Sequence, residues 1–117
     1  MSLQYLDSDN SGTHTNCVTN NVAGLTTLGN WLRSNKRQAF LSETGGGPRD
    51  SSCLTDVCQE LTYLNSNSDV FLGYTGWAAG SFDTSYTLSE TPTLTNGKYV
   101  DVPLVKQCIA GLFHPKK

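Results

Sequence analysis

The sequence predicts an α/β fold with a parallel sheet, because helical and strand-like patterns alternate along its 117 residues. Leucines recur with helical spacing in two segments, and a short apolar run with the length of a buried strand follows each of them. A third helical pattern closes the chain. The expected elements are a loop over 7–21, a helix over 21–35, a strand over 38–42, a helix over 52–65, a strand over 70–77, a loop over 78–100 and a helix from Asp101.

Each of the two longer helices is predicted from one apolar face. Leu25, Leu28 and Leu32 lie at positions i, i+3 and i+7, so they share a face of the first helix. Asp50 or Ser51 can cap the second helix. The apolar face of that second helix consists of Leu54, Val57, Cys58, Leu61 and Leu64.

The two predicted strands are short and do not complete a sheet. The segment 70–77 is apolar nearly throughout, which is typical of a strand buried on both faces of a parallel sheet. Residues 3–6 add a stub of a third strand. Because two parallel strands leave both sheet edges open, the sequence predicts part of a larger α/β fold. The loop over 78–100 is long enough to be functional, and Pro103 is tolerated in the first turn of the last helix.

The charge pattern does not favour nucleic acid or a membrane as a partner. The net charge is -2 and only 15% of the residues are charged. The clustered cations are those near the end of the first helix, over 33–37, and the tail pair Lys116 and Lys117. No apolar run reaches the length of a transmembrane helix. We therefore expect neither nucleic-acid binding nor membrane insertion.

The cysteines predict disulfides rather than a metal site. There are four, Cys17, Cys53, Cys58 and Cys108, and an even number with wide spacing fits two disulfides formed in an oxidising compartment. The chain has no CxxC pair, and its histidines, His14 and His114, lie far apart, so we predict no metal and no other cofactor. Residues 1–5 do not read as a signal peptide. We therefore expect a secreted protein whose true N-terminus, with its export signal, is missing from this sequence.

The segment from Phe40 to Gly47 is the candidate catalytic motif. A short apolar run ends in Glu43, and three glycines follow at 45–47. In an α/β protein this order places a carboxylate at the C-terminal end of a buried strand, where barrel enzymes keep their active sites. The alternative interpretation is a solvated carboxylate at a strand end, and the pattern by itself leaves that alternative open.

Three segments resemble the fungal endo-β-1,4-glucanases, which are cellulases of glycoside hydrolase family 5. They are 4–14 (QYLDSDNSGTH), 37–47 (RQAFLSETGGG) and 73–83 (GYTGWAAGSFD). The resemblance extends from Gln4 to about Ala110. It implies the C-terminal third of a (β/α)8 barrel, namely the end of strand six, strands seven and eight and three helices. On this basis residues 1–112 are a partial catalytic domain and 113–117 are a tail.

The resemblance also implies roles for individual residues. Glu43 matches the nucleophile of a retaining glycosidase, Trp77 matches the aromatic platform under the sugar at the cleavage point, and Tyr5 matches a tyrosine that holds the nucleophile. For Trp77, spacing alone leaves a core position open as the alternative. The cysteine pattern of the family pairs Cys17 with Cys53 and Cys58 with Cys108.

The same comparison implies an incomplete active site. Leu3 stands where the family has a histidine, and no segment here matches the strand that carries the general acid/base. The carboxylates Asp7, Asp9, Asp83 and Glu90 are poor substitutes for it. We therefore expect β-1,4-glucan as the ligand and no activity from the isolated chain, whose partner would be the missing N-terminal barrel segment.

A non-catalytic carbohydrate-binding or secreted interaction fragment is the second hypothesis. Tyr5 and Trp77, with Trp31, Tyr74 and Tyr86, could offer stacking surfaces for sugar rings. We expect Trp31 and Tyr74 to face the packing between helices and strands instead. A third hypothesis, in which two copies complete one barrel, is weak because both copies lack the same strand.

Overall fold

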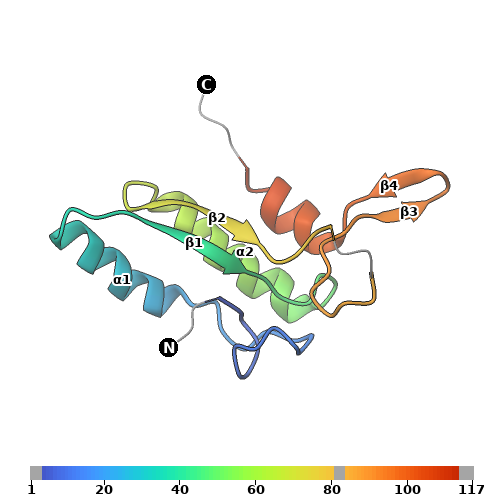
Figure 1. The fold of residues 1–117 in the computed structure, drawn as a ribbon, viewed down its shortest axis with the longest axis horizontal. Coiled ribbons are helices and arrows are strands. Elements are labelled where there is room, and N and C mark those ends of the chain that lie inside the picture. The colour runs from blue at the N-terminus through green and yellow to red at the C-terminus, as the bar shows by residue number, and fades with distance from the viewer. Residues whose placement is uncertain (1–3, 81–83, 114–117) are drawn as a thin grey trace.

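A computed structural model describes residues 4–80 and 84–113 as a thin molecule of two layers. Its shortest dimension is 22 Å, which fits one layer of helices, each about 10 Å across, packed on one layer of sheet. Figure 1 shows the helices beside the two central strands and a hairpin that projects from one end. The elements are α1 (Val22–Ser34), β1 (Ala39–Thr44), α2 (Ser51–Ser66), β2 (Phe71–Gly76), β3 (Thr93–Thr95), β4 (Lys98–Val100) and η1 (Val105–Ala110).

The central sheet confirms the predicted parallel pairing. β1 pairs with β2, and the register places Ala39 opposite Phe71 and Thr44 opposite Gly76. Among the described residues, the predicted stub of a third strand is reduced to a single parallel bridge between Tyr5 and Gly45. The carboxyl ends of β1 and β2, and the loops that follow them, therefore lie together at one edge of the sheet.

The helices α1 and α2 pack one face each against the sheet, and η1 packs on α2. The side chain of Asp50 accepts a hydrogen bond from the N–H of Ser52 and caps α2, which confirms one of the two predicted caps. Arg33 at the end of α1 bonds Asp69 in the turn between α2 and β2, with 2.7 Å between Nε and Oδ2. The buried core between these layers includes Leu6, Leu25, Leu32, Val57, Leu61, Leu64, Val70, Phe71 and Leu104.

Two disulfides tie the helices to their surroundings, and both have the predicted partners. Cys17 bonds Cys53 and so joins the first loop to the start of α2, with 5.0 Å between the Cα atoms. Cys58 bonds Cys108 and so joins α2 to η1, with 4.5 Å between the Cα atoms. Both distances lie in the ordinary range for disulfides.

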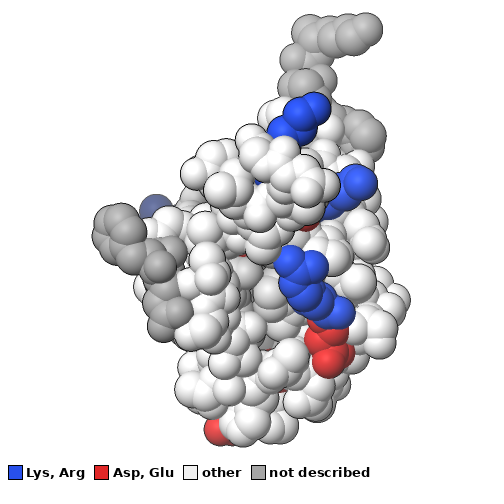
Figure 2. All heavy atoms as spheres, turned by 90° about the vertical axis from the view of Figure 1, so that its right-hand side faces the viewer, with Lys and Arg blue, Asp and Glu red and all other residues white. Residues whose placement is uncertain are grey.

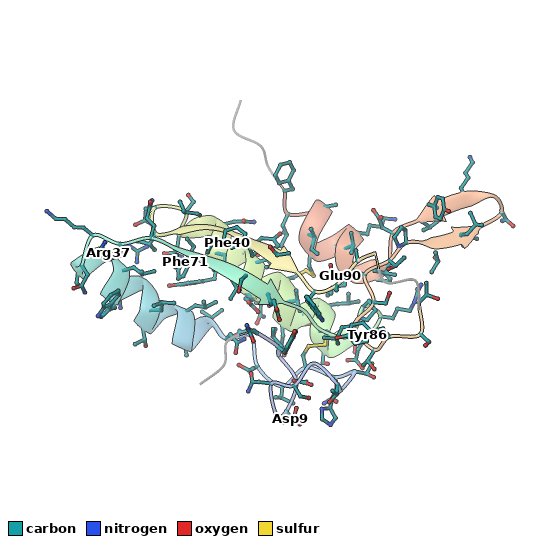
Figure 3. All side chains as sticks on the ribbon, viewed as in Figure 1. Asp9, Arg37, Phe40, Phe71, Tyr86 and Glu90 are labelled. Atoms are coloured by element: carbon teal, nitrogen blue, oxygen red, sulfur yellow. A yellow bond between two sulfur atoms is a disulfide. The ribbon has the colours of Figure 1, made fainter. Side chains whose placement is uncertain are left out.

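Two burial predictions are wrong. β2 is not buried on both faces, because Leu72 is 64% exposed, and Phe40 on β1 is 54% exposed. In Figure 3 Phe40 and Phe71 mark the neighbouring strands, and Phe71 is the one that packs on the helices, against Tyr63. Helices cover one face of this sheet and leave the other face open. Trp31 is 57% exposed on α1, so it does not face the packing between helices and strands.

The segment 78–100 is not the continuous loop that we predicted. It contains the hairpin of β3 and β4, whose turn residues Asn96 and Gly97 both have positive φ. Asn-Gly is the preferred pair for such a turn, so the signal was present in the sequence. The last helix begins at 103, near its predicted start at Asp101 and with Pro103 in its first turn, and its segment η1 is π-helical. Here the N–H of Leu104 bonds the carbonyl oxygen of Pro48.

Some predictions fall outside the described residues, namely those on Leu3, Asp83 and most of the tail, 114–117. Within the ranges that are described, no helix is both long and apolar enough to cross a membrane.

Candidate active site

Tyr5 and Glu43, which are 38 residues apart in the sequence, meet at the carboxyl end of β1. The hydroxyl of Tyr5 donates a hydrogen bond to Oε2 of Glu43, with 2.6 Å between the oxygens. This length is typical of a charge-assisted bond from a hydroxyl to a carboxylate. The backbone bridge between Tyr5 and Gly45 places the phenol beside the strand end, and so explains how two distant segments reach this geometry.

The electrostatics of this pair keep the phenol protonated. Burial raises the pKa of Tyr5 above its ordinary value, and the hydrogen bond to Glu43 and its negative charge raise it further. Tyr5 therefore remains a donor across the physiological pH range, and the bond fixes one carboxylate oxygen of Glu43.

The glycines after Glu43 do not form a turn themselves, since the turn follows at 48–49, but close packing requires two of them. A Cβ atom on Gly45 would collide with the backbone carbonyl oxygen of Trp77. A Cβ atom on Gly46 would lie 2.5 Å and 2.7 Å from the sulfur atoms of Cys17 and Cys53. The glycine segment 45–47 thus lets the end of β1 pack directly on the segment after β2 and on the first disulfide.

Trp77 lies at the same edge of the sheet as Glu43. It directly follows β2, and its N–H bonds the carbonyl oxygen of Thr44 at 2.7 Å, which extends the pairing of the two strands. Its side chain is 39% exposed, so Trp77 is not a core residue. The indole Nε1–H donates to the hydroxyl of Tyr86 at 3.0 Å. The three residues predicted from the sequence therefore gather at the carboxyl ends of β1 and β2.

Glu60 is a buried carboxyl group that the sequence analysis did not select. It lies on α2 with no exposed surface, and the hydroxyl of Thr44 donates to its Oε1 at 2.9 Å. Burial raises the pKa of Glu60 to about 8, although the bond from Thr44 acts in the opposite direction. A signal existed, because Glu60 lies three residues after Val57 and four before Leu64, on the apolar face of the helix.

Glu90 is a second buried carboxyl group, and it lies on the other side of β2. It is 6% exposed, and burial raises its pKa to about 7. The residue lines a cleft of about 930 Å³ that also includes Leu72, Tyr74 and Val105. Figure 3 places it beside η1. Among the described residues the cleft is lined by α2, β2, η1 and nearby loops, and β1 with Glu43 is not part of it.

Among the described residues, Asp7, Asp9 and His14 form a group of side chains that could hold a metal ion. One ligand atom from each lies within 4.8 Å of the others. However, Oδ2 of Asp7 already accepts hydrogen bonds from the backbone N–H groups of Thr13 and His14. Burial favours the neutral form of Asp7, but these bonds and that of the His14 ring lower its pKa overall. The cluster therefore has a structural explanation as the closure of its loop.

The surface carries few charges. Figure 2 views the end of the molecule that carries the hairpin, and its Lys and Arg side chains are scattered among uncharged ones rather than gathered in one patch. This agrees with the charge content of 15% and with the absence of a basic segment from the sequence.

A carboxylate held by a phenol, beside an exposed tryptophan at the carboxyl ends of parallel strands, fits the class of β/α enzymes that cleave sugars. The comparison with known sequences gives the family. The sequence profile of the family described as "Cellulase (glycosyl hydrolase family 5)" matches residues 4–81. The chain belongs to this family.

Individual relatives agree with this assignment. Endoglucanase EG-II of Hypocrea jecorina is 57% identical to this chain over 108 residues, which are 92% of this chain and 26% of EG-II. The crystal structure of Cel5A (EG2) from Hypocrea jecorina superposes with a TM-score of 0.85 at 57% identity, over 91% of this chain and 32% of that one. XacCel5A in complex with cellopentaose has a TM-score of 0.74 at 34% identity, over 88% and 33% of the respective chains.

These relatives imply a (β/α)8 barrel, of which this chain covers about a third of the crystallised length. The open sheet follows from that partial coverage. Phe40 on β1 and Leu72 on β2 are exposed, and we assign them to the face of the sheet that the helices leave uncovered.

Proposed function

We propose that residues 1–112 form part of the catalytic domain of a secreted endo-β-1,4-glucanase in which Glu43 is the nucleophile. The observation that carries this proposal is the 2.6 Å contact of Tyr5 with Glu43 at a strand end that also presents Trp77. It is supported by 57% identity to an endoglucanase over 92% of the chain. In barrel terms, β1 and β2 are strands seven and eight, and residues 4–6 are the end of strand six.

In the first step Glu43 attacks the anomeric carbon of the sugar. Because Tyr5 holds Oε2, the free oxygen Oε1 forms the bond to carbon, and the glycosidic bond breaks with its electron pair on the leaving oxygen. A general acid protonates that oxygen. In the second step the same group, now a base, takes a proton from water, which displaces Glu43 and restores the original anomeric configuration.

Trp77 is the platform for the sugar ring in this proposal. A flat aromatic face suits the apolar face of a pyranose and leaves the hydroxyl groups free to hydrogen-bond. The 39% exposure of Trp77 leaves part of the indole available for such a contact. Its place after β2, with its N–H on the carbonyl oxygen of Thr44, puts it next to the strand that carries Glu43.

The general acid is expected from a barrel segment outside this chain. Without protonation of the leaving group and activation of water, each step loses orders of magnitude in rate. We therefore propose that the isolated chain does not turn over, and that a polypeptide supplying the remaining strands is its functional partner. The exposed face with Phe40 and Leu72 is the surface that this partner would cover. The two disulfides support secretion of the whole protein.

Hydrolysis of carboxymethyl-cellulose tests the proposal in two proteins. One is the 117-residue chain, and the other is a chimera in which this chain replaces the matching segment of EG-II. We expect no turnover by the isolated chain. The chimera should hydrolyse the polymer with retention of the anomeric configuration, which NMR of the product measures. The substitution Glu43→Gln should abolish activity in the chimera. Turnover by the isolated chain, lost in the same variant, would contradict the proposed need for a partner.

A non-catalytic carbohydrate-binding role is the second candidate, and the exposed indole of Trp77 favours it. Binding of the isolated chain to cellulose would then depend on Trp77 and not on Glu43. A pull-down with Trp77→Ala and Glu43→Gln separates the two side chains. Loss of binding in the first variant alone, together with an inactive chimera, would favour this role over catalysis.

A further inference from the structure

The hydroxyl of Tyr86 connects Trp77 to a loop that is distant in the sequence. It accepts a hydrogen bond from Nε1–H of Trp77 at 3.0 Å, and it donates to the carbonyl oxygen of Gly12 at 3.4 Å. Gly12 and Tyr86 are 74 residues apart. In Figure 3 Tyr86 lies next to the loop that carries Asp9. The phenol is therefore used as both acceptor and donor, which a phenylalanine of the same shape cannot reproduce.

The segment that carries Tyr86 is anchored at both ends. The N–H of Ala78 bonds the carbonyl oxygen of Leu88 at 3.3 Å, and the N–H of Glu90 bonds the carbonyl oxygen of Ala78 at 2.8 Å. A turn follows Tyr86, whose carbonyl oxygen accepts from the N–H of Ser89 at 3.0 Å. Leu88 is 1% exposed. These contacts hold the backbone of Tyr86 in place, so its hydroxyl is a fixed point against which the indole can be oriented.

Gly12 continues this connection to the nucleophile. A Cβ atom on Gly12 would lie 3.3 Å from the ring of Tyr5 and 3.3 Å from the side chain of Leu88, so the loop packs directly on both. Tyr5 in turn holds Glu43 through its hydroxyl. A continuous set of contacts therefore runs from the indole of Trp77, through the hydroxyl of Tyr86 and the Gly12 loop, to the phenol that orients the carboxylate.

We propose that Tyr86 is a positioning residue that fixes the plane of the Trp77 indole relative to the Tyr5–Glu43 pair. This inference rests on the proposed function, in which Trp77 carries a ring of a β-1,4-glucan. Stacking on a flat ring depends on the tilt of that ring, and the Nε1–H bond restricts rotation of the indole about its side-chain bonds. Tyr86 thereby sets the angle at which the sugar meets Glu43.

The indole N–H resonances of the isolated chain test the contact without any ligand. The chain has two tryptophans, and the exposed Trp31 serves as an internal reference. In the wild-type chain the Trp77 indole proton should exchange with solvent more slowly than that of Trp31. In Tyr86→Phe it should shift and exchange faster, while Trp31 stays unchanged. The matched control is Tyr99→Phe, since Tyr99 is 76% exposed on β4, and this control should move neither resonance.

Cellopentaose binding tests the positioning role. We expect Tyr86→Phe to weaken binding by about three- to tenfold, as loss of one or two net hydrogen bonds implies. In a Trp77→Ala background the same substitution should have no further effect, because Tyr86 acts through the indole. Comparison of the circular dichroism spectra of Tyr86→Phe, Trp77→Ala and the double variant with that of the wild type verifies that each variant folds.

The outcomes separate this inference from the proposed function. Binding by the wild-type chain that Tyr86→Phe leaves unchanged would overturn the positioning role alone. An additive loss in the double variant would also overturn it, because Tyr86 would then contact the glucan independently of Trp77. No binding of cellopentaose by the wild-type chain would refute the glucan-binding role of Trp77, and with it this inference. Should Tyr86→Phe fail to fold, equal exchange of the two indole protons in the wild-type chain would still refute the contact.

Discussion

Replacement of the buried carboxyl group of Glu60 by an amide should change how the stability of the chain depends on pH. Glu60 has no exposed surface, and burial raises its pKa to about 8 from an ordinary 4.5. A group with a raised pKa holds its proton more tightly in the folded chain than in the unfolded one. Its stabilising contribution is therefore complete below about pH 4.5 and is lost as the pH rises to about 8.

The magnitude follows from the difference between these two pKa values, which is about 3.5. Because a difference of one corresponds to about 1.4 kcal/mol, the free energy of unfolding should fall by at most about 5 kcal/mol over this pH range. Glu90, whose pKa is raised to about 7, adds a smaller loss in the same direction. The variant Glu60→Gln cannot ionise, so it should keep only the part of the slope that comes from Glu90 and other groups.

Urea unfolding of the oxidised chain, at pH values from 4.5 to 8.5, measures this effect. At pH 8 Glu60→Gln should be more stable than the wild type by a few kcal/mol. At pH 4.5 Glu60→Gln should be no more stable than the wild type. Its amide oxygen keeps the bond from Thr44, but its NH2 group replaces the buried oxygen Oε2, which has no partner among the described residues. Asp56→Asn, which removes a less buried carboxylate from the same helix, is the matched control. Parallel curves for the wild type and Glu60→Gln would refute the assignment of a raised pKa to Glu60.

Two further predictions concern the packing that supports the site. Replacement of Cys58 and Cys108 by serine removes a disulfide with a sequence separation of 50. The free energy of unfolding should fall by about 4 kcal/mol, or the chain should fail to fold. Thermal unfolding without reductant measures this, and an unchanged midpoint would contradict it. Leu61→Ala should lower the free energy of unfolding by about 2–5 kcal/mol, because Leu61 is 1% exposed. In the same assay Leu72→Ala should lower it by less than about 0.5 kcal/mol, because Leu72 is 64% exposed. Equal losses would mean that the exposed face of the sheet is covered in solution.

The parts of the fold that depend on local spacing could be predicted from the sequence. The helices α1 and α2, predicted from periodic leucines, begin and end within a few residues of their predicted bounds. The same holds for the strands β1 and β2, which were predicted from apolar runs. The pairing of the cysteines was implied by the resemblance to the family. The hairpin at Asn96 and Gly97 has its turn signal in the sequence, but the length of the segment 78–100 favours one loop, and the hairpin departs from that prediction.

Other features depend on what surrounds a segment and leave no local signal. The apolar sequence of β2 led to the wrong prediction that both faces are buried, because a strand from a closed barrel has the same composition whether or not the remaining strands are present. The contact of Tyr86 with Gly12 joins residues 74 apart, so no spacing rule could reveal it. Glu60 was visible as a carboxylate on an apolar helix face, but its partner Thr44 emerges only from the packing of α2 on β1.

Covalent trapping tests the assignment of Glu43 as nucleophile most directly. The probe is a 2-deoxy-2-fluoro-β-cellobioside with a dinitrophenyl leaving group. Because dinitrophenolate departs without protonation, the nucleophile can attack, and the fluorine slows the later release of the sugar. After incubation with the chimera, mass spectrometry of the digested protein should show the fluorosugar on the peptide that contains Glu43, and no adduct in Glu43→Gln. An active chimera that carries the adduct on a different carboxylate, or on none, would contradict the assignment.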